Sequence, residues 1–241
     1  MTAFSILVVG LLLGMQHATE ADHLAAVATL ATRQGTLAQA LRQGVAWGVG
    51  HTLTLMAFGG LVFALGKAIS PGLEQALETA VGIMLILLGA DVLRRLIRDR
   101  IHFHVHRHDV DVAHIHAHSH RGEGRHDRSP HRHSHPRRWP LRALAVGMTH
   151  GLAGSAALVM LSLKGVPSVP LGLGYIALFG AGSIAGMAVL SMVIALPLRW
   201  SAGYLAGLHQ AMTALVGIFS CSLGVLMVVQ IGLLGSANPL S

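Results

Sequence analysis

Six apolar stretches, each long enough to cross a lipid bilayer as a helix, dominate this sequence of 241 residues. They run over residues 3–31, 38–66, 73–97, 140–163, 169–198 and 203–234. A helix needs roughly 20 apolar residues to span about 30 Å of hydrocarbon, and lipid tolerates only structures that satisfy every backbone hydrogen bond internally. Charged residues make up only 11% of the chain, far below their share in soluble domains. We therefore expect an all-α integral membrane protein with six transmembrane helices.

Basic residues are distributed unevenly between the two sides that six spans would create. One side receives Arg33, Arg42, the twelve arginines from Arg94 to Arg142, and Arg199. The other side receives Lys67 and Lys164. Because positively charged loops stay in the cytoplasm, the arginine-rich side is predicted to be cytoplasmic and both termini to lie outside. We expect a multi-pass protein of the bacterial inner (plasma) membrane, whose net charge of +7 reflects contact with anionic lipid rather than with nucleic acid.

Short segments of sequence recur in the two halves of the chain at a nearly constant offset. Gly14-Met15-Gln16-His17 recurs as Gly147-Met148-Thr149-His150, and Val81-Gly82-Ile83 recurs as Val216-Gly217-Ile218. This pattern indicates two three-helix units, and because three is odd, the second unit enters the membrane from the opposite face. Secondary transporters commonly have such inverted repeats and bind substrate between the halves, near the midplane. Chance recurrence of Gly and Ala words in apolar helices is the alternative.

The repeats and the region between them divide the chain into three predicted parts. Residues 1–100 form the first three-helix repeat, and residues 140–241 form the second. Residues 101–139, which hold twelve of the 17 histidines, form a cytoplasmic loop that is partly disordered.

Two histidines and two carboxylates interrupt the first apolar stretch, which reads His17-Ala18-Thr19-Glu20-Ala21-Asp22-His23 at this point. Ionisable groups inside lipid are costly, so we interpret the cluster as functional rather than as a means of joining helices. On a regular helix, at 100° per residue, His17, Glu20 and His23 share one face and Asp22 points away. Imidazole and carboxylate together suit borderline divalent ions. Asp22 is then expected to orient a histidine ring, or to bind the ion directly if the helix unwinds locally.

Two further histidines lie within apolar stretches. His51 is flanked by glycines that permit the close approach of a neighbouring helix, and we expect it to join the metal ligands. His150 is the repeat partner of His17, and either a metal ligand or an interhelical hydrogen-bonding group fits this position. The other positions of the cluster carry no ionisable side chain in the second half. The first repeat alone is therefore predicted to supply the carboxylates.

Histidines alternate with other residues in the central loop. The alternating residues are His102, His104, His106, His108, His114, His116, His118 and His120. Because side chains alternate between the two faces of an extended chain, a short hairpin that turns around residues 109–112 would present its histidines on one face. Such a face is expected to bind several divalent ions, weakly and with fast exchange. A flexible polar linker with incidental histidines is the alternative.

The spacing of His17 and Asp22-His23 resembles the signature His-Ala-x-Asp-Ala-Asp-His of the nickel/cobalt transporter family, with Glu20 in place of its first aspartate. Gly50-His51-Thr52 looks like that family's Gly-His-Ser/Thr motif. Family members commonly have eight spans, so this chain looks closer to the six-span, urease-accessory-type branch of the wider superfamily. The resemblance implies that the cluster and His51 belong to a metal path, with nickel or cobalt as substrate.

Together these features predict a transporter, not an enzyme, that imports a divalent transition-metal cation. Nickel and cobalt come first as substrates, with zinc or iron as alternatives. Metal efflux by the same fold is one alternative function, and an intramembrane zinc hydrolase is another, because three ligands and an acidic base also suit metal-activated water. The expected partners are the metal ion, membrane lipid and a cytosolic metallochaperone.

Overall fold

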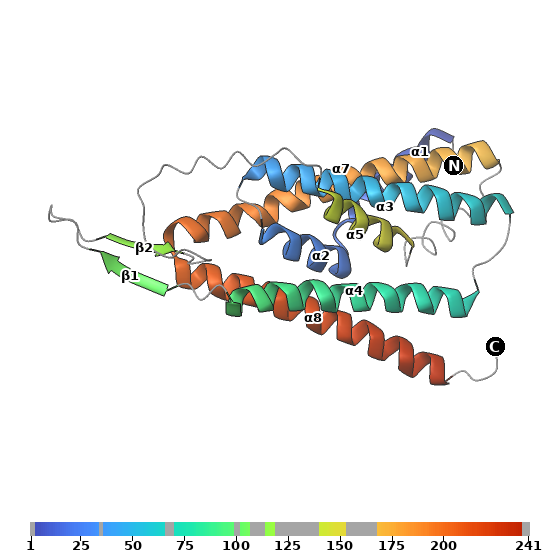
Figure 1. Cartoon of the computed structure of the whole chain (residues 1–241). Helices are drawn as coiled ribbons and strands as arrows, with labels where there is room; N and C mark the ends of the chain where they lie inside the picture. The colour runs from blue at the N-terminus through green and yellow to red at the C-terminus, as the bar shows by residue number, and fades with distance from the viewer. Residues whose placement is uncertain are drawn as a thin grey trace.

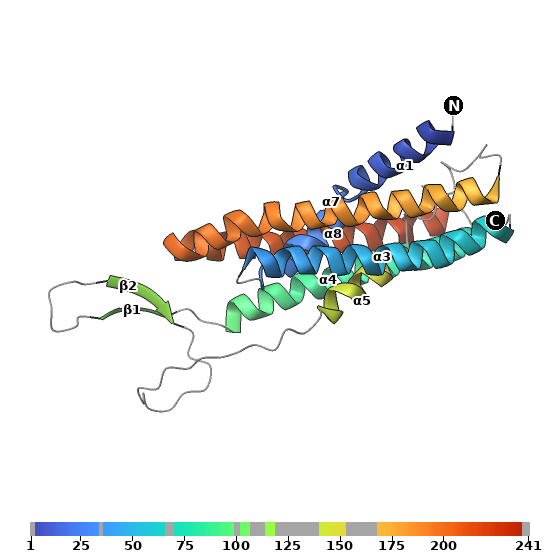
Figure 2. The same ribbon diagram turned by 90° about the horizontal axis from the view of Figure 1, so that it is seen from above.

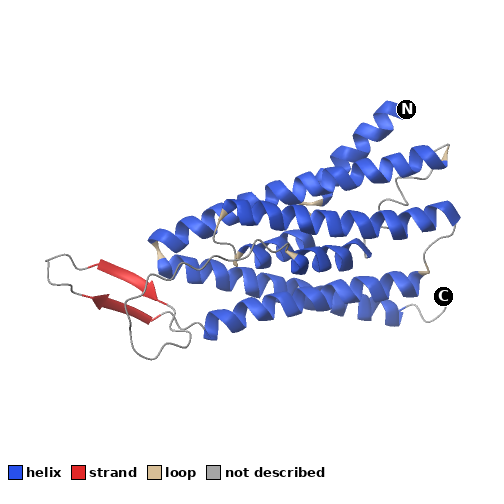
Figure 3. Ribbon diagram, turned by 45° about the horizontal axis from the view of Figure 1, so that its top comes forward, coloured by secondary structure: helices blue, strands red, loops and turns tan. Residues whose placement is uncertain are grey.

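The computed structural model describes residues 3–33, 36–65, 70–98, 102–106, 114–118, 140–152 and 168–237. These ranges contain seven helices and one two-stranded sheet (Figure 1; Figure 3). The helices are α1 (Ala3–His17), α2 (Ala21–Ala31), α3 (Leu37–Leu65), α4 (Pro71–Arg98), α5 (Leu141–Leu152), α7 (Val169–Tyr204) and α8 (Ala206–Ala237). The strands are β1 (His102–His106) and β2 (His114–His118).

Three helical segments are long and apolar enough to cross a membrane: Pro71–Arg98, Pro170–Ala202 and Gly207–Gly232. The bent pair α1 and α2 adds a fourth if both helices belong to one span. Large apolar side chains on these helices face outward; Leu87 and Leu215 are each 65% exposed. A soluble protein would bury such surface, so the chain is an integral membrane protein. The expected number of six spans exceeds what length and composition show for the described residues, and it stays a prediction.

The first apolar stretch is not one continuous helix, contrary to our expectation. α1 ends at His17 and α2 begins at Ala21, and the two helices are bent by 56° relative to each other. Thr19 closes the end of α1, because its backbone N–H and its hydroxyl donate to the Gln16 carbonyl oxygen at 2.9 and 2.6 Å. Glu20 is extended (φ −63°, ψ 150°) and starts α2. Discontinuous membrane helices of this kind bring helix ends to a substrate site.

Glycines allow the backbones of neighbouring helices to touch. A Cβ on Gly147 of α5 would lie 2.1 Å from the Trp47 carbonyl oxygen in α3, and a Cβ on Gly14 of α1 would lie 2.0 Å from that of Phe179 in α7. No real side chain fits at such distances. These glycines therefore set the spacing of α3 with α5 and of α1 with α7.

The glycine contacts come in pairs that the repeat offset exchanges. The paired contacts are Gly14–Phe179 with Gly147–Trp47, Gly50–Leu144 with Gly182–Leu11, and Gly82–Gly224 with Gly217–Gly89. Equivalent residues of the two halves are 132, 133 or 135 positions apart. Replacing both members of a contact by their equivalents in the other half gives the second contact of the pair. The two halves of the chain thus make equivalent contacts with each other.

The helices form two groups. α3 and α7 lie side by side and run antiparallel, with α5 against α3 and α1 against α7 (Figure 2). α4 and α8 form a second antiparallel pair, and α2 contacts both groups (Figure 1). α1 begins and α8 ends at one end of the molecule, while the strands lie beyond the other end (Figure 1).

The core surrounds α2. Eight of its eleven residues are buried, and four of these are alanines, whose small side chains let neighbouring helices approach closely. Trp47 of α3, Leu85 of α4 and Met187 of α7 are fully buried in the same cluster. This packing places the first turn of α2, with Asp22 and His23, in the interior of the molecule.

The two strands pair in an antiparallel hairpin, as the alternating histidines predicted. The Cα register sets His102 opposite His118, His104 opposite His116 and His106 opposite His114. The predicted turn at residues 109–112, together with His108 and His120, lies outside the described residues. Metal binding by this hairpin stays a prediction.

Candidate metal centre

Four buried histidines from four helices gather at the break between α1 and α2. They are His17 of α1, His23 of α2, His51 of α3 and His150 of α5, and none is more than 4% exposed. The ring centroids of His17 and His23 lie 4.3 Å apart, and those of His23 and His150 lie 4.2 Å apart. The His51 ring lies 5.3 Å from both His17 and His23. The predicted histidines therefore meet in space, including His150, for which the sequence left two interpretations open.

Two overlapping groups of side chains in the cluster can hold a metal ion. One consists of His17, His23 and His51, and the other of Asp22, His23 and His150. Within each group, one candidate ligand atom per residue lies within 4.8 Å of the others. Small ring rotations would bring such atoms to metal bonds of about 2.1 Å. His23 belongs to both groups and is therefore central to either arrangement.

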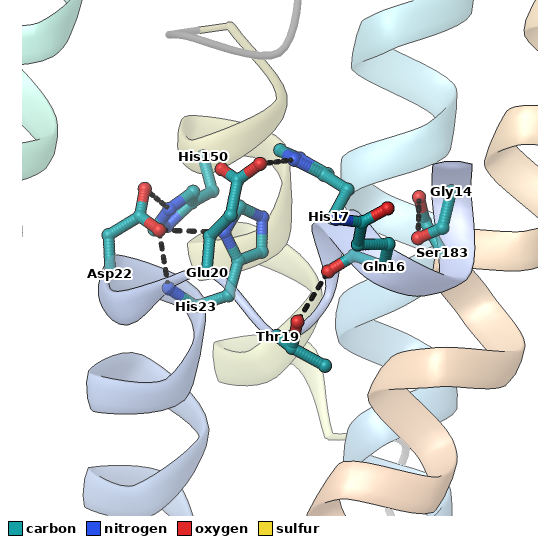
Figure 4. A network of polar contacts seen from close by, with 9 residues as sticks. All are labelled: Gly14, Gln16, His17, Thr19, Glu20, Asp22, His23, His150 and Ser183. Atoms are coloured by element: carbon teal, nitrogen blue, oxygen red, sulfur yellow. Dashed lines mark hydrogen bonds and ion pairs between the residues drawn. The ribbon is translucent and has the colours of Figure 1, made fainter. Parts of the chain in front are cut away.

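The Asp22 carboxylate holds two of the rings (Figure 4). Its Oδ1 lies 2.9 Å from Nδ1 of His23 and accepts a 2.8 Å hydrogen bond from the backbone N–H of the same residue. Its Oδ2 lies 2.9 Å from Nε2 of His150. An ionised carboxylate can only accept hydrogen bonds, so each ring nitrogen that faces it carries a proton. The opposite nitrogens, Nε2 of His23 and Nδ1 of His150, then keep their lone pairs for a metal.

The position of Asp22 corrects the expectation from a regular helix. Asp22 was predicted to point away from His17 and His23, but the bend after His17 turns the first turn of α2 so that Asp22 contacts His23 and His150. Glu20 lies at the rim: its Oε1 is 2.9 Å from Nδ1 of His17, and its side chain is 43% exposed. Glu20 belongs to neither of the two groups. Because α1 ends at His17, Glu20 does not share a helical face with His17 and His23, and its metal role stays a prediction.

Several ring nitrogens of the cluster are buried without a hydrogen-bond partner. In the described part of the chain these include Nε2 of His17, Nε2 of His23, both nitrogens of His51 and Nδ1 of His150. Each unsatisfied buried polar group costs about 1–3 kcal/mol, and native proteins contain few of them. A cation bound between the rings would satisfy several of these lone pairs at once. The donor set therefore fits a metal better than it fits a purely structural role.

Neighbouring groups adapt the surroundings of the cluster to a cation. The carbonyl end of α1, which carries a partial negative charge, ends at His17 within the cluster. Trp47 lies 5.4 Å from the ring of His23, and Phe179 lies 5.4 Å from that of His17. These aromatic walls limit access of water, which strengthens the interaction between an ion and its ligands.

A cavity of about 220 Å³ connects the cluster with the α4–α8 pair. Its lining includes His17, Asp22, His23 and His150 from the cluster, and Glu78 and Gln230 from α4 and α8. Glu20 also lines it, which makes three carboxylates, whereas no Lys or Arg among the described residues belongs to its lining. A cavity lined by one sign of charge attracts ions of the opposite sign, so this one favours cations.

Glu78 is the lining residue that the sequence reasoning missed. It lies within the apolar stretch 73–97 and is half-buried. The rule that singled out the first stretch, that ionisable groups inside lipid mark functional sites, would have identified it as well.

The sequence of one relative matches almost the whole chain. The chain is 33% identical over 233 residues to the urease accessory protein UreH of Bacillus sp. (strain TB-90). The match covers 95% of this chain and 92% of that protein. No family model and no solved structure matches the chain. Because the similarity extends over nearly the full length of both proteins, this chain belongs to the family of the urease accessory protein UreH.

Proposed function

We propose that this protein carries a divalent transition-metal cation across the cell membrane into the cytoplasm. The observation that carries the proposal is the cluster of four buried histidines and Asp22 at the break between the apolar helices α1 and α2. Placing five ionisable side chains inside lipid is costly unless they bind something that needs them. A mobile substrate ion meets that need and also accounts for the cavity that reaches the cluster.

The direct ligands in this proposal are His17, His23 and His51, which offer ring nitrogens without hydrogen-bond partners. Asp22 orients His23 and, through its second oxygen, His150. Three protein ligands leave coordination positions open, so the ion can exchange rather than remain trapped. This is the arrangement expected for a substrate in transit.

Nickel is the preferred substrate, followed by cobalt, with zinc or iron as alternatives. Imidazole nitrogens suit all of these ions, so the ligand chemistry does not separate them. The relative from Bacillus is named as an accessory protein of urease, and the motif from His17 to His23 resembles the signature of nickel/cobalt transporters. We carry this association over to the present chain as the reason for placing nickel first.

The transport path in this proposal runs between two inverted units of three spans each, residues 1–100 and 140–241. The glycine contacts that exchange under the repeat offset support this architecture. The uneven distribution of arginines supports a cytoplasmic position for the segment 101–139. The histidines of that segment would receive the ion on the inner side and pass it to a metallochaperone.

Radioactive nickel flux tests the proposal. In proteoliposomes that hold the purified protein, His23→Ala is expected to abolish nickel accumulation, because His23 belongs to both candidate ligand groups. His209→Ala is the matched control: Nδ1 of His209 lies 3.0 Å from the Leu198 carbonyl oxygen, outside the cluster. Uptake by His23→Ala at the wild-type rate would contradict the proposal. Net nickel movement only in the outward direction would instead identify an efflux protein.

A further inference from the structure

We propose that Glu78 of α4 is the access site of the cavity, a carboxylate that takes a hydrated divalent cation from water and passes it to the buried histidines. This inference rests on the proposed function and adds an outer site to it. Glu78 lies on a different helix from every member of the histidine cluster, and it meets the cluster only through the cavity that both line.

Burial increases along the cavity from Glu78 toward the histidines. Gln230 is exposed and Glu78 is half-buried, whereas His150 and His23 are only 2% and 1% exposed. At the buried end, Nε2 of His23 has no hydrogen-bond partner among the described residues. An ion that enters on the α4–α8 side of the cavity therefore meets Glu78 before it reaches a nitrogen with a free lone pair.

The two ends of the cavity differ in ligand chemistry. Carboxylate and amide oxygens, which Glu78 and Gln230 offer, bind ions that keep much of their water. Imidazole nitrogens bind borderline transition metals more strongly once water has left. This order, oxygen first and nitrogen second, lets the ion lose its hydration shell in steps rather than at once.

Glu78 is also available for a cation. Within the described ranges no Lys or Arg forms an ion pair with it, and the charged group that acts on it is Glu74, one helical turn earlier. Asp91, which lies nearer the end of α4, is in contrast bound by Arg33, Arg95 and Arg142. Glu78 thus lines a cavity that leads to imidazole nitrogens without hydrogen-bond partners, and no described Lys or Arg neutralises it. This arrangement suits a passing cation better than a structural ion pair.

Glu78 has no acidic counterpart at the equivalent position of α8. The repeat offset of 135 residues places Thr213 of α8 where Glu78 stands in α4, and His209 where Glu74 stands. Glu78 lies in the first third of α4 (Pro71–Arg98). α4 starts at the end of the molecule where α1 begins and α8 ends (Figure 1). The predicted topology places this end outside the cell. The access site therefore faces the medium from which an importer takes its ion.

Nickel uptake at varied concentration tests the inference on the full-length protein in proteoliposomes. Glu78→Gln keeps the shape and removes the charge, and we expect the KM for nickel to rise about tenfold, the effect of one partly screened charge near a cation. The maximal rate should change less than about twofold, because the histidines that hold the dehydrated ion are intact. Glu78→Asp keeps the charge and should show a smaller rise.

Glu74→Gln is the matched control, since Glu74 is also half-buried on α4 but does not line the cavity. Its KM should stay within about twofold of the wild-type value, because Glu74 acts on Glu78 through its charge but does not line the cavity. Size-exclusion profiles establish that each variant is folded, and equilibrium binding of nickel to the purified protein should show unchanged stoichiometry in Glu78→Gln.

Three outcomes would overturn the inference. A wild-type KM in Glu78→Gln, while His23→Ala abolishes uptake, refutes the access site and leaves the proposed function standing. Equal defects in Glu78→Asp and Glu78→Gln would show that charge is not what matters at this position. Loss of the bound ion in Glu78→Gln would place Glu78 among the inner ligands. Wild-type uptake in both Glu78→Gln and His23→Ala would instead refute the proposed function itself.

Discussion

Replacing Asp22 by Asn separates the role of its charge from its shape. The carboxylate accepts from the ring and backbone N–H groups of His23 through Oδ1 and from the His150 ring through Oδ2. In Asp22→Asn, the amide oxygen is expected to take the Oδ1 position, because two N–H groups of His23 point there. The amide NH₂ group then faces Nε2 of His150 and donates to it. The proton of His150 must consequently move to Nδ1, whereas His23 keeps its orientation.

The expected loss of metal affinity follows from these contacts. A hydrogen bond to a charged group contributes about 1.5–3 kcal/mol and a neutral one about 0.5–1.5 kcal/mol, so the bond to His23 weakens by about 1.3 kcal/mol. That energy equals about a tenfold rise in the dissociation constant. If the ion is instead held by Asp22, His23 and His150, the variant loses an anionic ligand and the lone pair of His150. The loss would then exceed about a hundredfold.

Isothermal titration of nickel into the purified protein measures this difference. Asp91→Asn is the matched control, because it makes the same chemical change at an aspartate whose partners are Arg33, Arg95 and Arg142, away from the cluster. Its nickel affinity should equal that of the wild type. Wild-type affinity in Asp22→Asn would refute our reasoning that the carboxylate orients His23 for metal binding. A loss of more than about a hundredfold would identify the second ligand group as the site.

Two further predictions concern packing and protons. Gly147→Ala should destabilise the protein by about 2–3 kcal/mol and lower its melting temperature in detergent, because the new Cβ would lie 2.1 Å from the Trp47 carbonyl oxygen. Gly72→Ala is the control and should leave the melting temperature unchanged, because no described atom lies within 4 Å of its new Cβ. Equal melting temperatures for the two variants would contradict the close contact of α3 with α5. Nickel affinity should be lost when the pH is lowered far enough to protonate the buried imidazoles, because imidazoles bind metal only when deprotonated. A titration in which the affinity stays constant until the protein unfolds would argue against histidine ligands.

Local features of this chain could be read from its sequence because they depend only on neighbouring residues. The apolar stretch 38–66 corresponds to α3 (Leu37–Leu65), and the stretch 73–97 corresponds to α4 (Pro71–Arg98). Hydropathy and length decide such segments without reference to the rest of the fold. The pairing of β1 with β2 followed from the alternation of histidines with other residues along both strands.

The repeat was also visible in the sequence, although its physical meaning was not. Gly14 and Gly147 were recognisable as equivalent, but only the structure shows that each meets a carbonyl of a helix in the opposite half. The candidate histidines were identified one by one. His51 was expected among the metal ligands, but the sequence left open whether His150 joins them.

The geometry of the candidate site depended on a break that the sequence does not mark. Neither Gly nor Pro lies between His17 and Ala21, so a regular helix was the natural expectation, and it placed Asp22 on the wrong face. Distant residues accompany the bend: Ala18 packs against Gly186, and the Ser183 hydroxyl donates to the Gly14 carbonyl oxygen at 3.2 Å.

The sequence by itself determined that this protein lies in a membrane, that it repeats, and which imidazoles and acids of its first span deserve a functional interpretation. Only the tertiary structure decided that Asp22 faces His23 and His150, and that Glu78 shares their cavity. The physical reason is that hydropathy and periodicity are properties of adjacent residues. The direction of a side chain beyond a bend is set by contacts with helices far away in the chain.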